Sequence, residues 1–243
     1  MIGPGLPVRC VPPPPAVPGA GLRVLVFGSA RSGTTLLLNL FRTFEDVHVR
    51  DGEHCLGDLL GATTPGWTVA KRTPHCADHF GADLADFPDT WIVDIVRDPR
   101  DVVTSVLPPW PGFYCDFARW DRDVRAVAAL RGRHLRLVQL RYEDLVRQGD
   151  AVQGQLANLL GLTVRLPFSS FPQAVPADLS EQAVSALGGV RPLSDRQVGR
   201  WQRSPERRDR VREQLRSHPF MEPMLQCLGY PATVWEETND DHR

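Results

Sequence analysis

The sequence predicts an α/β fold of three layers, with a central, roughly five-stranded parallel sheet flanked by helices. Two observations predict it: short apolar runs alternate with amphipathic stretches, and a glycine-bounded turn joins the first run to the first stretch. Parallel strands need long crossover connections, which are usually helices, so this alternation favours a parallel sheet. The 243 residues are enough for one such domain with a sizeable core.

The expected strands are short and rich in β-branched or aromatic side chains. Val24–Phe27, in a strand expected over 23–27, is continuously apolar, as in a strand buried on both faces. Residues 91–96 have the same character. The remaining strands are expected at 47–50, 67–71 and 135–140.

Helical periodicity and capping signals predict the helices. In the stretch 34–44, Leu37, Leu40 and Phe44 fall on one face. Ser204 and Pro205 have the residue types of an N-cap and a first helical position. The expected helices span 34–44, 77–86, 100–107, 114–131, 150–160, 181–187, 204–216 and 219–228.

Composition suggests a single domain with a tail at each end. Residues 1–21 contain seven prolines and are expected to form an extended, disordered leader. Residues 22–232 form the expected domain, and 233–243 an acidic C-terminal tail.

Charge and cysteine usage exclude several classes of protein. The net charge of −1 argues against a protein that coats nucleic acid or an anionic membrane. Five scattered cysteines without a C-x-x-C pair indicate a reducing compartment. Because no membrane-length apolar run and no standard signal peptide are visible, we expect a cytoplasmic protein. Lys71 is the only lysine among the 28 basic residues.

The turn after the first strand has the spacing of a phosphate-binding loop. Its sequence, Gly28-Ser-Ala-Arg-Ser-Gly-Thr-Thr35, places two glycines five residues apart before a helix. Such glycines let successive N–H groups surround an anion. The lysine of the nucleoside triphosphatase pattern is replaced by Thr34, and Arg31 is the cation of the loop.

A second phosphate motif follows the strand at 91–96. Arg97-Asp-Pro-Arg-Asp101 begins where that strand ends, and Ser105 comes eight residues after Arg97, on the helix expected next. Open α/β sheets bind ligands at the carboxyl ends of their strands, and a guanidinium suits a phosphate group.

The two motifs together resemble those of the PAPS-dependent sulfotransferases, which have a P-loop fold, and are closest to the tyrosylprotein-type and bacterial small-molecule branch. The resemblance implies that the loop holds the 5′-phosphosulfate, that Arg97 and Ser105 hold the 3′-phosphate, and that no metal is required. Weaker matches at Arg141-Tyr-Glu-Asp-Leu145 and in 190–201 extend it. The cofactor-binding residues it implies are Arg31, Ser32, Gly33, Thr34, Thr35, Arg97, Ser105, Tyr142, Arg191 and Arg200.

Sulfuryl transfer also needs a general base and a group that stabilises the leaving phosphate. Lys71 resembles the family's lysine upstream of the second motif, although here the sequence Lys-Arg-Thr-Pro is one residue longer. Three residues compete as base: Glu53 is ranked first, His75 second, and His54 is the third alternative. The histidines are not spaced as metal ligands.

The function predicted from these motifs is sulfuryl transfer from PAPS to a hydroxyl, or less readily an amine, of a small-molecule acceptor, with release of 3′,5′-ADP. Two alternatives stay open. One is a P-loop small-molecule kinase, in which Thr34, Thr35 and Asp94 would organise Mg²⁺, and the other is a non-catalytic nucleotide-binding module. Leu107–Tyr114 either lines the acceptor pocket or forms a packed structural loop. Neither nucleic acid nor membrane is expected as a partner, and a homodimer is left open.

Overall fold

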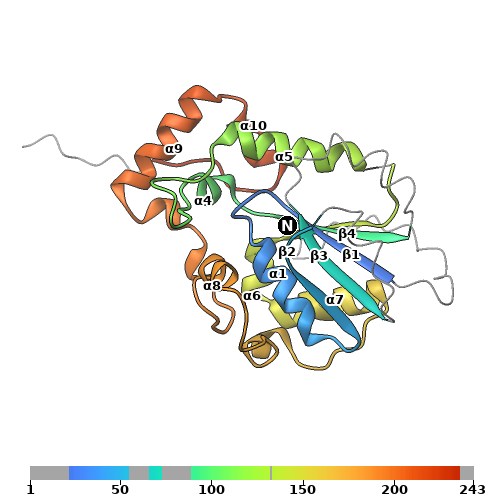
Figure 1. The fold of residues 1–243 in the computed structure, drawn as a ribbon. Coiled ribbons are helices and arrows are strands. Elements are labelled where there is room, and N and C mark those ends of the chain that lie inside the picture. The colour runs from blue at the N-terminus through green and yellow to red at the C-terminus, as the bar shows by residue number, and fades with distance from the viewer. Residues whose placement is uncertain (1–21, 55–65, 73–88, 132, 236–243) are drawn as a thin grey trace, which may run out of the picture.

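The computed structural model describes residues 22–54, 66–72, 89–131 and 133–235. A five-stranded sheet with the order β2-β3-β1-β4-β5 forms its centre, and every neighbouring pair is parallel (Figure 1). The predicted α/β class is therefore confirmed. The strands are β1 (Leu22–Phe27), β2 (Val47–Glu53), β3 (Trp67–Arg72), β4 (Thr90–Val96) and β5 (Leu137–Arg141).

Helices cover both faces of the sheet. They are α1 (Thr34–Leu40), α4 (Pro99–Val103), α5 (Phe117–Leu130), α6 (Tyr142–Arg147), α7 (Gly149–Leu160), α8 (Glu181–Leu187), α9 (Pro205–Ser217) and α10 (Met221–Cys227). Short 3-10 turns are η1 (Phe41–Thr43), η3 (Phe168–Gln173), η4 (Asp195–Gln197) and η5 (Arg200–Gln202). The helix expected at 77–86 lies outside the described residues, and α6 was not predicted.

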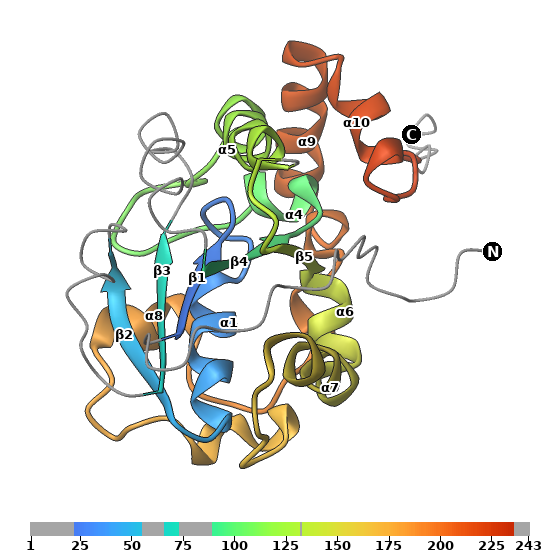
Figure 2. The same ribbon diagram turned by 90° about the vertical axis from the view of Figure 1, so that its right-hand side faces the viewer.

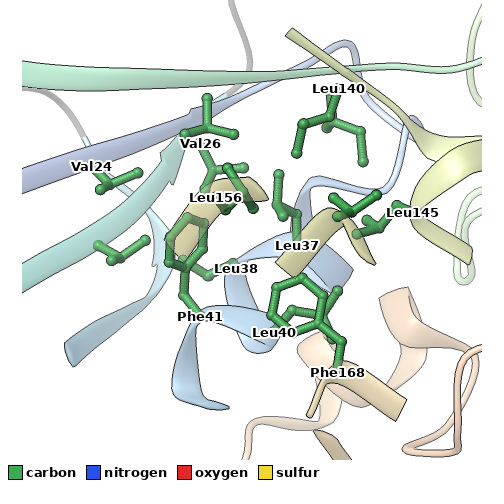
Figure 3. Packing of buried hydrophobic residues seen from close by; sticks show 14 of the residues in the cluster. Val24, Val26, Leu37, Leu38, Leu40, Phe41, Leu140, Leu145, Leu156 and Phe168 are labelled. Carbon is green, nitrogen blue, oxygen red and sulfur yellow. The ribbon is translucent and has the colours of Figure 1, made fainter. Parts of the chain in front are cut away.

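One face of the sheet packs on α1, α6 and α7, and the other on α5. Leu37 and Leu40 of α1 are buried in the same cluster as Val24 and Val26 of β1, which Figure 3 shows. On the opposite face, Val127 and its neighbours on α5 meet Leu25, Phe27 and Ile92 of the strands. Helices α4, α9 and α10 extend the α5 side, as Figures 1 and 2 both show. Burial on both faces explains why the central strands are almost wholly apolar.

The prediction that Ser105 lies on a helix is wrong. Helix α4 ends at Val103, and Ser105 lies in the connection beyond it. Arg207 of α9 donates a hydrogen bond to the Thr104 carbonyl, an oxygen that a longer helix would use itself. The chain then forms a bridge between Val106 and Phe113. This tertiary contact, which the local sequence does not show, turns the chain out of the helix.

Strand register brings three motifs to one edge of the sheet. Phe27 of β1 lies beside Asp94 of β4, so the loop after β1 and Arg97 follow neighbouring strands. Val26 of β1 lies beside Lys71 of β3 on its other side. The carboxyl edge of the sheet, where open α/β folds bind ligands, therefore carries all three. Within the described ranges, none of the helices has the length and apolar character to cross a bilayer.

Candidate functional site

The loop between β1 and α1 is built for close backbone approach. Gly33 caps α1 with φ of 107°, which disfavours a side chain, and a Cβ there would lie 2.7 Å from Cδ2 of Tyr142. Arg31 also has a positive φ, of 69°, which is uncommon for a residue other than glycine. The loop therefore holds Arg31 in an unusual conformation and seats the Tyr142 ring directly on Gly33.

Arg97 ties the second motif to this loop. Its Nη1 donates a hydrogen bond of 3.1 Å to the carbonyl of Arg31, and its Cζ lies 4.3 Å from the centroid of the Tyr142 ring. Its Nη2 donates to the carbonyl of Gln197, 2.5 Å away. Arg97 is only 7% exposed, and these two carbonyl groups and the Tyr142 ring fix the position of its guanidinium. Such fixed orientation suits recognition of a phosphate.

Two buried polar atoms in these motifs have no hydrogen-bond partner in the described part of the chain. They are Nε of Arg97 and Oγ of Ser32. Buried polar groups are almost always paired, so an unpaired donor in a phosphate loop marks the place of a ligand acceptor. Of the two residues, Arg97 lines a cavity, where its Nε fits an oxygen of a nucleotide phosphate or phosphosulfate.

Ser105 meets Arg31 across the site. Nε of Arg31 donates a hydrogen bond of 3.0 Å to Oγ of Ser105. Burial, and to a lesser degree the charge of Arg97, lower the pKa of Arg31. An anion bound beside these two guanidinium groups would relieve their repulsion.

A cavity of about 260 Å³ lies over the loop and collects most of the predicted cofactor-binding residues. Ser32 is buried and does not line it, and Arg191 is exposed, with its Nη1 donating a hydrogen bond of 2.6 Å to the carbonyl of Gly188. Arg191 instead lines an adjoining hollow of about 50 Å³ together with Tyr142. The eight predicted residues that line the cavity of about 260 Å³ are Arg31, Gly33, Thr34, Thr35, Arg97, Ser105, Tyr142 and Arg200.

A second and larger cavity, of about 470 Å³, shares a wall with the first. Arg31, Thr34 and Thr35 line both. Glu53 and Lys71 line the larger one, where they are paired in register across β2 and β3 and form an ion pair. The two residues that the sequence assigned to base and charge stabilisation therefore lie side by side in this cavity.

The other candidates for the base are placed differently. His54 does not line either cavity, and its Nε2 lies 2.6 Å from the carbonyl oxygen of Asp51. His75 lies outside the described residues. Of the two candidates within the described residues, Glu53 is the one that lines a cavity beside the phosphate loop.

The segment Leu107–Tyr114, before α5, was expected either to line the acceptor pocket or to form a packed structural loop, and different parts of it do each. Leu107 and Tyr114 line the larger cavity, whereas Trp110 is 62% exposed. Phe113 packs below the guanidinium groups of Arg207 and Arg210 on α9. The two ends of the segment thus contribute to a pocket, and its middle does not.

Sequence reasoning missed two charged residues of the site. Asp101, the last residue of the second motif, accepts hydrogen bonds from the backbone N–H groups of Gly199 (2.8 Å) and Trp201 (3.0 Å). It thereby fastens the segment that carries Arg200 to α4, and burial raises its pKa. Arg119 of α5 lines the larger cavity, and nothing in the sequence separates it from the other arginines.

The sequence and the fold were compared with those of known proteins. A family model described as the sulfotransferase family matches residues 55–165. The resemblance to the sulfotransferases is confirmed. The sulfotransferase domain from the curacin biosynthetic pathway has a TM-score of 0.58 and 16% identity, covering 88% of this chain and 99% of that domain. At that identity the likeness shows a common sulfotransferase fold.

A further solved structure has a lower score. The sulfotransferase domain from the Synechococcus PCC 7002 olefin synthase has a TM-score of 0.48 and 17% identity, covering 76% of this chain and 90% of that one. Among curated proteins the chain finds no match.

In the kinase alternative, Asp94 would help to organise Mg²⁺. Its carboxylate does not face either cavity. Asp94 is 2% exposed, accepts a hydrogen bond of 2.7 Å from Nε2 of Gln139 on β5, and lines neither cavity. Among the described residues, no group of three or more histidine, cysteine or acidic side chains is arranged to hold a metal. The site of this sulfotransferase fold is dominated by guanidinium and backbone donors instead.

Proposed function

We propose that the protein transfers the sulfuryl group of PAPS to a hydroxyl of a small-molecule acceptor. The observation that carries the proposal is the wall of Arg31, Thr34 and Thr35 between the two cavities. A phosphosulfate held by the loop would present its sulfuryl group to the larger cavity. The sulfotransferase family match and the shared fold support the same reaction class.

The smaller cavity supplies the groups that a bisphosphorylated nucleotide requires. The N-terminus of α1 and Arg31 suit the 5′-phosphosulfate. Arg97 and Ser105 suit the 3′-phosphate, and Arg200 adds positive charge at the rim. The donor contributes an activated sulfuryl group, whose bond to the 5′-phosphate oxygen breaks as a bond to the acceptor oxygen forms.

Glu53 and Lys71 supply proton transfer and charge compensation. An acceptor hydroxyl beside Glu53 would give its proton to the carboxylate. Glu53 then loses the negative charge that balances Lys71, and the freed ammonium can compensate negative charge that develops on the leaving group. The ion pair thus links removal of the proton to stabilisation of the leaving group.

Two measurements test the proposal. Calorimetric titration with 3′,5′-ADP in EDTA should show binding that Arg97→Ala abolishes, because Arg97 holds the site together from β4 to η4. Incubation with PAPS and a library of phenols, alcohols and amines should give products 80 mass units heavier, roughly the mass of a sulfuryl group.

Each alternative predicts a different result. Arg125→Ala serves as the control, because Arg125 is exposed on α5 and pairs with Asp121. Tight binding of 3′,5′-ADP without turnover of any acceptor would favour the non-catalytic module. Mg²⁺-dependent binding of ATP, with no affinity for 3′,5′-ADP, would overturn the proposal in favour of a kinase.

A further inference from the structure

Among the described residues that line the larger cavity but not the smaller one, one cation has no ion-pair partner in the lining. Both carboxylate oxygens of Asp51 accept hydrogen bonds of 2.7 Å from Arg42, and Glu53 is paired with Lys71. Arg31 belongs to the wall shared with the nucleotide side and is hydrogen-bonded to Ser105. Arg119 is the remaining charged residue of the lining.

Arg119 is partly buried and has no ion pair within the described ranges. Its Cζ lies 5.0 Å from the centroid of the Tyr114 ring, and its Nε is buried without a hydrogen-bond partner there. The neighbouring acids accept hydrogen bonds from other groups: Asp116 caps α5 by accepting from the Arg119 backbone N–H, and Asp123, whose charge also acts on Arg119, accepts from Ser29 Oγ at 2.9 Å. A half-buried guanidinium beside a cavity is stabilised when an anion enters.

The rest of the lining is mostly small or apolar. Leu38, Leu107, Ala183 and Ala186 give the cavity apolar walls, and Tyr114 holds the Arg119 side chain from one side. A ligand that satisfies the whole cavity therefore has an apolar body, a hydroxyl for Glu53 and an anionic group for Arg119.

We infer that Arg119 forms an anion subsite in the acceptor pocket, and that the acceptor is an amphipathic hydroxy compound carrying a carboxylate or a comparable anionic group. This inference rests on the proposed function, because it assigns the second substrate of the same reaction. Arg119 acts in recognition: it holds the anionic end of the acceptor and takes no part in proton transfer.

The test compares acids with their neutral amides as acceptors. The probes are 4-hydroxyphenylacetate and 8-hydroxyoctanoate, each beside its primary amide, with PAPS as donor. An arginine–carboxylate contact predicts that kcat/KM for the better acid exceeds that for its amide by about tenfold or more. Arg119→Gln should remove this preference, mainly by raising KM for the acid, and leave 3′,5′-ADP binding unchanged. Arg125→Gln, on the exposed side of the same helix, should keep the preference.

A reversed charge gives a second variant and a check on folding. Arg119→Glu should disfavour the acid and favour a probe with an ammonium group in place of the carboxylate, such as tyramine. Equal rates for acid and amide in the wild-type protein, or an acid preference that survives in Arg119→Gln, would overturn the inference while sulfuryl transfer stands. Loss of 3′,5′-ADP binding and of all transfer in the wild-type protein would instead overturn the proposed function, and the inference with it.

Discussion

Nε of Arg31 and Oγ of Ser105 lie 3.0 Å apart, which joins two motifs that are 74 residues apart in the chain. The contact is made at the carboxyl edge of the sheet, where the loops after β1 and β4 meet. Each residue alone is an ordinary polar side chain. Together they fix one guanidinium of the phosphate site in a single orientation.

Ser105→Ala should therefore weaken nucleotide binding more than it affects folding. Loss of the hydroxyl removes a hydrogen bond to a charged group and frees the Arg31 side chain, which should raise the Kd of 3′,5′-ADP about tenfold. Calorimetry measures the affinity, and thermal unfolding should show little change because Ser105 is partly exposed. Ser217→Ala, at an exposed serine of α9, is the matched control. An unchanged Kd would remove Ser105 from the nucleotide site.

Gly33→Ala should both destabilise the protein and abolish binding of 3′,5′-ADP. The new Cβ would meet the Tyr142 ring at 2.7 Å, at a φ of 107°. The expected loss of unfolding free energy is about 1–3 kcal/mol. Gly161→Ala separates the two causes, because Gly161 has a φ of 72° but nothing within 4 Å of the added Cβ. Denaturant unfolding should show a smaller loss for Gly161→Ala, and its nucleotide affinity should be unaltered; equal losses in the two variants would contradict the contact.

The parallel sheet could be predicted because its central strands are buried on both faces and so differ strongly in composition from the rest of the chain. Helix α8 was predicted with its observed ends, since Ser180 caps it and Gly188 follows it. Helix α6 was missed because its six residues start directly from β5 without a side-chain cap. Its length is too short for a periodic pattern to be recognised.

The candidate site could be predicted where a short motif has a fixed spacing, as in the Gly28–Thr35 loop and in the segment from Arg97 to Ser105. The contact between Glu53 and Lys71 depends instead on the register of β2 against β3, which shifts between Val49 and Glu53. The position of Arg119 in the cavity lining depends on how α5 packs beside the loop. Neither the strand register nor this packing can be recognised from the local sequence.

Lys71→Arg should keep the positive charge and still lose turnover. The guanidinium is larger and planar, so in the proposed mechanism it would not replace the compact ammonium that pairs with Glu53. We expect kcat to fall at least about tenfold, and Glu53→Gln to lower it about 10²-fold or more. Because the two side chains act as a pair, the double variant should be little slower than Glu53→Gln. Steady-state rates with PAPS test this, with Arg125→Lys as the control. Effects that multiply in the double variant would mean that the two residues act independently.

Asp94→Asn should change stability in a pH-dependent way. Burial raises the pKa of Asp94 to about 6, against an ordinary value of 3.8, although the hydrogen bond from Gln139 opposes the shift. The folded protein then holds a proton that the unfolded chain loses first, so Asp94 lowers stability progressively as the pH rises from about 4 to 6. Asparagine cannot ionise, and its carbonyl oxygen can still accept from Gln139. The variant should therefore gain about 2 kcal/mol relative to the wild-type protein between pH 4 and pH 7. Urea unfolding at the two pH values measures this gain, and Asp209→Asn, at an exposed position, should show none. A difference from wild type that is the same at both pH values would show that Asp94 does not titrate in this range.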